Sequence, residues 1–409
     1  MNTFITPNWV TKDVAKFWKN SIKLVGNFDR SWDDSWRNKP EGAQIGYTVQ
    51  VRIPQRFVVN SGQALQQQAI LNQTVPLTIN HQEHVGMGWS SADATVEVEE
   101  VQNRYTMPAG QALANKVDKT AGEEVYKSVY FSIGAPGAGA ISDNETYLNG
   151  VALLQNVGVP EEFCAVLDPR SQAAILNANV ALFNPQKQIG DYFRTGQFGA
   201  EALGIDEWYY DPNMPTHTTG TFTASTPVTS SASQTGSSLA ISGMGTYALK
   251  AGDVFTIADV YAVNPVSYAD TGELQQFVLT ADVSGSSTAT LSISPSIVTS
   301  GQLQTVTASP ANGAALTFLG ATGTVGATMT ATRSRQSLIF NPAAFAFVFV
   351  DLKENLAGAV TSMARSKEAR ISMRWVEQYN IQTDQNPSRV DILYGTAPIL
   401  PYFALRAWS

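Results

Sequence analysis

The chain has 409 residues, a net charge of −8 and one cysteine, and only 15% of its residues are charged. This length suits one large domain or two to three ordinary ones. An acidic chain gains nothing from counterion release on nucleic acid, so sequence-specific DNA binding is not expected. The single cysteine, Cys164, excludes a disulfide framework within the chain, and we interpret it as a small buried apolar residue. The low charged fraction suggests that much of the surface is covered by something other than water, such as further copies of the chain.

The N-terminal region predicts a helix followed by two tryptophans among charges, Trp32 and Trp36. One helical face collects apolar residues: Val14, Phe17, Trp18, Ile22 and Val25. The two tryptophans fit either a partner surface or the chain's own core, and both alternatives stay open. The first 20 residues lack the pattern of a signal peptide, so we expect a chain made in a reducing cytoplasm.

Residues 46–101 predict strands joined by a long excursion. Alternating apolar and polar residues indicate strands over 47–57, 75–90 and 94–101. The polar run "NSGQALQQQAILNQT" separates the first two, which predicts a two-stranded excursion with a mobile tip. His81 and His84 share the second strand at a spacing of three, so they lie on opposite faces and are not expected to bind one metal.

Three helices and a buried strand follow. The pattern predicts a long helix over 108–131, opened by Pro108, with this apolar stripe: Leu113, Val117, Ala121, Val125 and Val129. A second helix is expected over 143–159 and a strand over 163–168. Asp168 and Pro169 open a third helix, whose expected stripe is Ala173, Leu176, Val180 and Phe183. Loop and short helix are expected from Asn184 to Gly220.

The middle of the chain predicts an all-β insertion over about 222–332. Neither Pro212–Leu249 nor Val283–Thr332 contains Asp, Glu, Lys or Arg, and short apolar strands with Gly and Ser turns lie between and within them. The α+β pattern resumes at Gln336. Its most apolar run, 343–352, is shorter than the roughly 20 residues of a membrane span and predicts a buried strand. The expected fold class is therefore α+β with an inserted β domain.

Motifs that carry chemistry are scarce. The sequence contains no phosphate-binding loop of the Walker type and no G-x-S-x-G elbow. His217 lies in a Thr-rich loop, and a Ser-His-Asp arrangement around it is open because such sites are recognised by geometry. With three histidines and one cysteine, we expect no enzyme, no catalytic residue, no cofactor and no metal site.

Three stretches carry a resemblance to a known family. They are "LKAGDVFTIADVYAVNP" with "LQQFVLTADV", the lead-in "YFRTGQFGAEALGIDEWYYDPNMPTHTTGT", and the helix "MPAGQALANKVDKTAGEEVY". Through these stretches and the order of its predicted elements, the chain resembles the major capsid (coat) proteins of tailed double-stranded DNA phages. It is most similar to the short-tailed-phage coat proteins that carry a β-barrel insertion domain.

The resemblance implies the tailed-phage capsid fold and a division of the chain. The implied regions are an N-terminal arm (1–44), an extended loop (45–78), a peripheral domain (79–139) with its spine helix (108–131), the first segment of an axial domain (140–221), the inserted β domain (222–332), and the second segment of the axial domain with a C-terminal return to the peripheral domain (333–409).

The resemblance also implies function and partners. The chain would self-assemble through pentamers and hexamers into the icosahedral head shell around double-stranded DNA, which it would contact non-specifically. A separate scaffolding protein, a portal and optionally a decoration protein are implied, with no membrane. Assembly would occur in the host cytoplasm and the product would be the virion capsid. We predict inter-subunit contacts at Trp32, Trp36, Arg52, Arg56, Gln66 and Gln67, although each also fits ordinary surface or core packing.

Two departures and three rival functions qualify this interpretation. No lysine occurs from Pro40 to Asn115, so cross-linking through a loop lysine is not expected and the shell should be non-covalent. No long charged helical prefix precedes the arm, so neither a fused scaffold nor a cleaved leader is expected. The rivals are a nanocompartment shell protein of the same fold, a phage tail or adhesin protein, and a hydrolase with an unrecognised triad.

Overall fold

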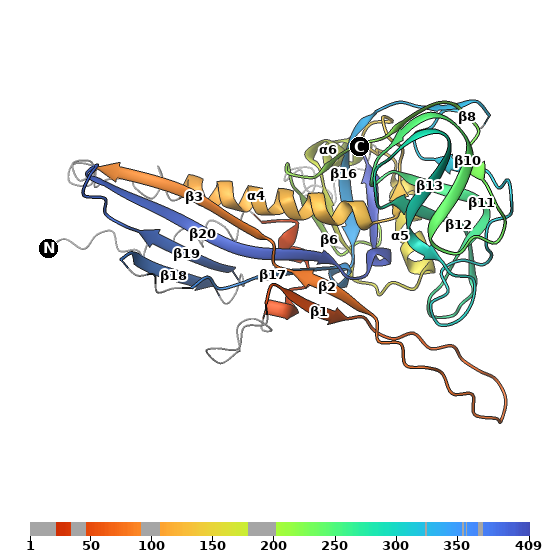
Figure 1. The fold of residues 1–409 in the computed structure, drawn as a ribbon, viewed down its shortest axis with the longest axis horizontal. Helices are drawn as coiled ribbons and strands as arrows, with labels where there is room; N and C mark the ends of the chain where they lie inside the picture. Colours follow the sequence, from red (N-terminus) through yellow and green to blue (C-terminus); the bar gives the residue numbers. More distant parts are fainter. Residues whose placement is uncertain are drawn as a thin grey trace, which may run out of the picture. The chain divides into compact units, whose positions relative to one another are not determined.

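The computed structural model is a mixed α+β structure in which strands predominate (Figure 1), as the sequence predicts. It describes residues 22–33, 46–90, 107–178, 202–323, 325–353, 356, 358–366 and 371–409. The chain divides into two compact units. Unit 1 comprises Met1–Val51, Thr74–Ala121 and Phe345–Ile399, and unit 2 comprises Arg52–Gln73, Gly122–Ala344 and Leu400–Ser409. Within the described ranges, no helix is both long and apolar enough to cross a membrane.

Unit 1 is built on a five-stranded sheet centred on one long strand, β20 (Gln385–Pro398). The path runs β17–β20–β19–β18, and β3 also pairs with β20, all antiparallel. The other strands are β17 (Phe345–Phe349), β19 (Ile371–Glu377), β18 (Val360–Ser366) and β3 (His81–Ser90). Every residue of β17 is buried, which confirms the buried strand expected in the apolar run 343–352.

The long helix α4 (Met107–Val125) buries four members of the predicted stripe, and the fifth, Val129, is buried beyond the end of the helix. The helix ends six residues before the expected position 131, so that boundary was wrong. A 3-10 turn, η4 (Tyr126–Ser128), follows, and then strand β4 (Phe131–Ile133) pairs with the distant C-terminal strand. Residues 131–133 have helical spacing in the sequence, but their pairing with the C-terminal strand makes them a strand.

A short stretch of the N-terminal segment is anchored to α4. The backbone N–H groups of Lys23 and Val25 donate to the buried carboxylate of Asp118, at 2.9 and 3.1 Å. Ile22 and Val25 are buried, as expected for one face of the predicted helix, but Val25–Asn27 is a 3-10 turn (η1). The other members of that predicted face lie outside the described residues, as does the strand expected over 94–101.

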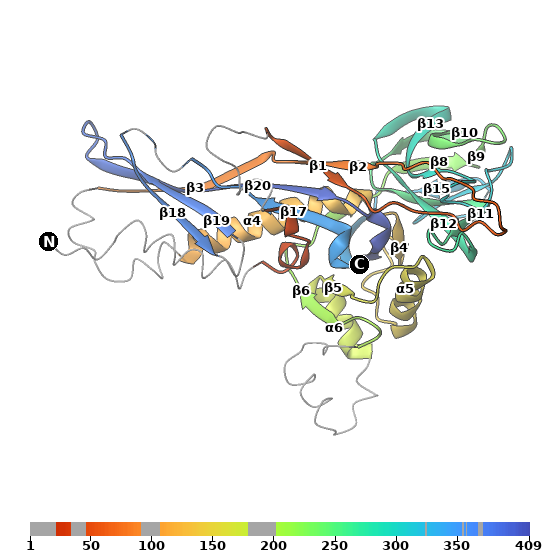
Figure 2. The same ribbon diagram turned by 90° about the horizontal axis from the view of Figure 1, so that it is seen from below.

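Unit 2 contains a six-stranded sheet, which we call the host sheet, in the order β4–β21–β16–β5–β6 with β7 paired to β16. Its further strands are β21 (Ala404–Trp408), β16 (Arg333–Phe340), β5 (Cys164–Leu167), β6 (Glu207–Tyr210) and β7 (Thr216–Thr218). Helices α5 (Asn144–Asn156) and α6 (Pro169–Ala178) lie beside it (Figure 2). Asp143 and Asp168 cap these helices through backbone N–H groups, so both expected helix starts are confirmed.

Two local expectations for this region were wrong. In α6, Ser171 and Ile175 are buried whereas Ala173 is exposed, because the face that meets the core is offset from the predicted stripe. Two of the expected stripe residues, Val180 and Phe183, lie outside the described ranges. In the described part of the segment expected as loop and short helix, 202–220, the structure has strands β6 and β7, since each is fixed by pairing with a distant strand. Residues 345–399 belong to unit 1 with β3, and the division into peripheral and axial domains stays a prediction.

The predicted insertion over 222–332 is an eight-stranded antiparallel sheet from Thr221 to Met329. Its strands are β8 (Thr221–Ser225), β9 (Val228–Thr229), β10 (Gly236–Leu249), β11 (Val254–Val263), β12 (Asp270–Leu279), β13 (Val283–Ile297), β14 (Leu316–Phe318) and β15 (Ala327–Met329). Phenylalanine rings from β8, β11, β12 and β14 pack in its own core. The sheet path ends at β14 and β15, and one isolated bridge joins Val228 to Ala315, so a closed barrel stays a prediction.

We expect the buried ion pair of unit 1 to contribute more to stability than its exposed neighbour. The Asp391 carboxylate is fully buried and accepts from Arg374 at 2.6 Å and from Arg389 at 2.9 Å. Arg374 is 7% exposed and Arg389 is 42% exposed. Arg374→Ala should therefore lower the free energy of unfolding by about 3 kcal/mol, and Arg389→Ala by less than about 1 kcal/mol.

Urea unfolding of the two variants, followed by tryptophan fluorescence, measures this difference. Equal losses would contradict the assignment of Arg374 as the main partner of Asp391.

Candidate functional site

Several exposed apolar side chains lie on a hairpin that extends from β1 (Thr48–Arg52) and β2 (Thr74–Thr78). Figure 1 shows the two arms running side by side to the turn. Five of the fifteen large apolar side chains that are exposed lie on these arms: Phe57, Val59, Leu65, Ile70 and Leu71. We call them the apolar hairpin set. No charged residue occurs from Phe57 to Gln82. An uncharged, exposed apolar segment of this kind is typical of a protein interface.

The predicted contact residues are distributed unevenly. Gln66 and Gln67 are exposed near the tip, and Arg52 is exposed at the end of β1. Arg56 is half-buried, with its guanidinium 4.9 Å from the Tyr402 ring of the same chain. Four of the six thus lie on one hairpin, and their contact role stays a prediction.

The two tryptophans of the predicted contact set are placed differently. Trp32 is half-buried in the 3-10 turn η2 (Ser31–Asp33). Trp36 lies outside the described residues.

Sequence reasoning missed the glutamine that makes the contacts. Gln68 exchanges hydrogen bonds with the backbone of Val58 across the hairpin and accepts another from Gln302, whereas its neighbours in the run "QQQ" are exposed. Alternation along the arm places Gln66 and Gln68 on one face, but nothing in the sequence says which of them meets a partner.

A buried polar joint connects the turn between β10 and β11 of the inserted domain to the host sheet. His217 Nε2 lies 2.9 Å from Asp253 Oδ1, and His217 Nδ1 lies 3.2 Å from the Tyr126 hydroxyl. The Asp253 carboxylate also accepts the backbone N–H groups of Gly220, at 3.1 Å, and Lys250, at 2.8 Å. Burying a carboxylate is costly unless its oxygens are hydrogen-bonded, so these bonds hold the joint together.

Arg406 brings the C-terminal strand β21 into this joint. Its guanidinium is fully buried, donates to the carbonyl of Gly252 at 3.0 Å, and lies 5.3 Å from the Trp408 ring and 5.9 Å from the Tyr126 ring. Desolvation lowers the pKa of Arg406 to about 10, so the group remains charged at neutral pH. The aromatic faces therefore surround a buried cation.

Two glycines allow the segments of the joint to approach closely. A Cβ on Gly220 would lie 2.5 Å from the carbonyl oxygen of Ala248. Gly252 has a φ of +103°, and a Cβ there would lie 3.0 Å from His217. Both positions require glycine, the second because left-handed backbone is strained for other residues.

The joint does not resemble a working triad. In the tautomer that satisfies both contacts of His217, the Tyr126 hydroxyl donates to Nδ1 and Nε2–H donates to Asp253. Burial raises the pKa of Tyr126, so its hydroxyl stays protonated, unlike an activated nucleophile. The three residues are at most 5% exposed, which keeps substrates out. The arrangement holds the inserted sheet and the host sheet together.

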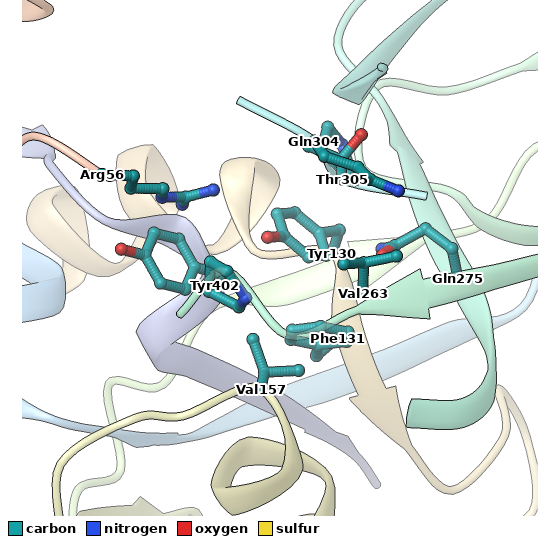
Figure 3. Close-up of a pocket in the computed structure, with 11 residues that line it drawn as sticks. Arg56, Tyr130, Phe131, Val157, Val263, Gln275, Gln304, Thr305 and Tyr402 are labelled. Carbon is teal, nitrogen blue, oxygen red and sulfur yellow. The ribbon is translucent and has the colours of Figure 1, made fainter. Parts of the chain in front are cut away.

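Figure 3 shows a cavity within unit 2, with Arg56 and Tyr402 side by side at one end and Gln304 and Thr305 at the other. Its volume is about 30 Å³, whereas small-molecule sites occupy roughly 300–1,000 Å³. A water molecule needs at least about 10–15 Å³ measured in this way, so the cavity has room for one or two waters and not for a cofactor.

Removing Asp253 should destabilise the chain more than removing the nearby exposed Asp282. Asp253→Ala leaves buried donors of the joint without an acceptor, which should cost about 3 kcal/mol in the free energy of unfolding. Asp282 is 59% exposed and contacts Lys250 Nζ at 2.8 Å, so Asp282→Ala should cost less than about 1 kcal/mol. Chemical denaturation of both variants compares the losses, and indistinguishable curves would contradict the joint.

Cys164 should be unreactive in the folded chain. Burial raises the pKa of its thiol to about 12, above the ordinary value of about 8.5, so the thiol stays protonated at pH 8. Because the folded pKa is raised, its contribution to stability is complete below about pH 8.5 and is lost as the pH rises towards 12. Iodoacetamide labelling at pH 8 should modify the chain only in urea, and rapid native labelling would contradict this environment.

Comparisons with known proteins place the chain in a family. No curated protein matches the sequence. Similar solved structures include "Mycobacterium phage Che8", which has a TM-score of 0.45 and 11% identity and covers 94% of this chain and 90% of its own. Another is "Capsid structure of the Cyanophage P-SCSP1u", which has a TM-score of 0.43 and 11% identity and covers 90% of this chain and 84% of its own. The "CUS-3 coat protein I-domain" matches with 28% identity over 24% of this chain and 96% of that chain, at a TM-score of 0.19. All three TM-scores are below 0.5, so the assignment depends on a family model instead. The model described as "P22 coat protein - gene protein 5" matches residues 43–404, most of the chain, and the chain therefore belongs to the P22 coat protein family.

Proposed function

We propose that copies of this chain assemble through pentamers and hexamers into the head shell of a tailed phage. Membership of the P22 coat protein family makes the chain a major capsid protein that forms an icosahedral shell. The match of residues 43–404 to the family model is the single observation that carries this function. It also disfavours a nanocompartment shell and gives no support to a tail or adhesin role.

The described surface supports the hairpin as an assembly element. A subunit interface commonly buries about 800 Å² on each partner and is apolar at its centre. The apolar hairpin set supplies such side chains on one extended segment, with no charge to be desolvated. We therefore add Phe57, Val59 and Leu65 to the contact residues proposed on the hairpin, which are Arg52, Arg56, Gln66 and Gln67. Trp32 and Trp36 remain proposed contacts of the arm.

The domain roles follow from the same proposal. They are an arm (1–44), an extended loop (45–78), a peripheral region (79–139), an axial region (140–221 and 333–409, the latter with a C-terminal return to the peripheral region) and an inserted β domain (222–332). The grouping of residues 345–399 with β3 in unit 1 supports that return. The sheet and separate core found between Thr221 and Met329 support treating the insertion as its own domain.

The proposed partners are a separate scaffolding protein and a portal, with a decoration protein as an optional addition. Assembly would occur in the host cytoplasm, and contact with packaged DNA would be non-specific, which suits a net charge of −8. The proposed role is structural and not enzymatic, because the family is one of coat proteins and the Tyr126–His217–Asp253 group serves as a joint.

Assembly should depend on the apolar hairpin set. The chain, expressed with and without its genomic neighbours, should form closed shells, or shells with spirals and tubes, in negative-stain electron microscopy. Leu65→Asp buries a charge at the proposed contact and should lower the yield of shells at least about tenfold, since each 1.4 kcal/mol is tenfold in an equilibrium constant.

Val325→Asp is the matched control, because Val325 is 82% exposed and Leu65 is 85% exposed. A uniform monomer or small oligomer under all conditions would overturn the proposed function. Equal effects of the two substitutions would overturn the role of the hairpin. A covalent ladder on a denaturing gel would contradict a non-covalent shell.

A further inference from the structure

The hairpin keeps its two arms together without a strand ladder. Beyond the bond from Ile53 N to Gln73 O, residues 54–73 contain no strand. Gln55 Nε2 donates to the carbonyl of Ala69 at 3.0 Å. Gln68 Oε1 accepts from Val58 N at 2.9 Å, and Gln68 Nε2 donates back to the carbonyl of Val58. Two glutamine side chains thus replace the backbone bonds that a regular hairpin would have.

The same Gln68 attaches the hairpin to the inserted domain of its own chain. Gln302 Nε2 donates to Gln68 Oε1 at 3.0 Å, so this oxygen accepts two hydrogen bonds and uses both lone pairs. On the opposite arm, the Arg56 guanidinium lies over the ring of Tyr402 at 4.9 Å. All of these residues belong to unit 2.

Hydrogen bonds fix the loop of the inserted domain that carries Gln302. The Tyr268 hydroxyl donates to the carbonyl of Gln302 at 3.0 Å. The loop around Gln302 is closed by backbone bonds from Gln304 N to Gly301 O, at 3.2 Å, and from Thr305 N to Val298 O, at 2.9 Å. The Gln302 side chain therefore projects from a fixed loop.

We infer that a clasp positions the hairpin for assembly, defined as Gln68 with Gln302 of the inserted domain and Arg56 with Tyr402, which lies between β20 and β21. The inference rests on the proposed function, because it assumes that the hairpin binds a second copy of the chain. Ordering the hairpin before contact removes some of the entropy cost of association, so the clasp speeds shell growth. Gln302 is a positioning residue that acts through Gln68.

Amide hydrogen exchange of the unassembled full-length chain tests the clasp. Gln302→Ala removes only the clasp bond, whereas Gln68→Ala also removes the bonds to Val58. One lost neutral hydrogen bond corresponds to about a fivefold change in an equilibrium, so exchange of the Val58 N–H, which donates to Gln68, should rise about fivefold in Gln302→Ala and more in Gln68→Ala. Gln66→Ala, in the same glutamine run but exposed, should change nothing.

The double variant Gln68→Ala/Gln302→Ala tests whether the two glutamines act through one hydrogen bond. If Gln68 and Gln302 act through one bond, Gln68→Ala should raise exchange less in the Gln302→Ala background than in the wild-type chain. Gln302→Leu keeps the side-chain volume and should reproduce Gln302→Ala. Unfolding curves in urea verify that each variant is folded.

Light scattering during shell assembly tests the consequence. The initial rate of shell growth should fall about fivefold for Gln302→Ala and stay at the wild-type value for Gln155→Ala, an exposed glutamine of α5 that lies outside the proposed contacts. Unchanged exchange in Gln302→Ala would overturn the clasp, and faster exchange with unchanged shell growth would overturn its role in assembly. If the wild-type chain formed no shells, the proposed function would fail, and the exchange result would still decide whether the clasp exists.

Discussion

The buried carboxylate of Asp253 is the constraint on which unit 2 depends. A charge in that position is tolerated only because donors from several segments reach it, among them Gly220 at the start of the insertion and His217 on β7. Arg406 adds a buried cation that reaches the same turn through Gly252. Since the joint uses residues from distant regions of the chain, the inserted sheet and the host sheet are energetically coupled. Most buried residues of the inserted sheet form their own core, but Val254 and Val278 pack in the core of the host sheet.

This coupling explains how the inserted domain stays fixed to the host sheet. The chain leaves the host sheet after β7, builds the eight-stranded sheet and returns in β16, which pairs with β7. Entry and exit are therefore neighbouring strands, and the joint lies next to them. The clasp at Gln302 would add a second connection, from the inserted domain to the hairpin.

The sequence predicted best where local signals are strong. Aspartates before apolar runs located the starts of α5 and α6, and uncharged segments with alternating apolar residues located the insertion. It failed where pairing partners are distant. β6 is four residues long and exists because it continues the sheet beside β5, and Phe131 leaves the helical pattern to pair with Leu405. For the candidate site, the hairpin was predicted, but Gln68 and the joint around Asp253 depend on contacts that no sequence spacing reveals.

The absence of charge between Phe57 and Gln82 has a consequence for how the shell would respond to its surroundings. Attraction between charged side chains is screened by salt over about 8–10 Å, whereas apolar contacts are not weakened in this way and are strengthened by sulfate and phosphate. Apolar contacts weaken on cooling. A shell held through this hairpin would therefore tolerate high ionic strength and be most easily loosened in the cold.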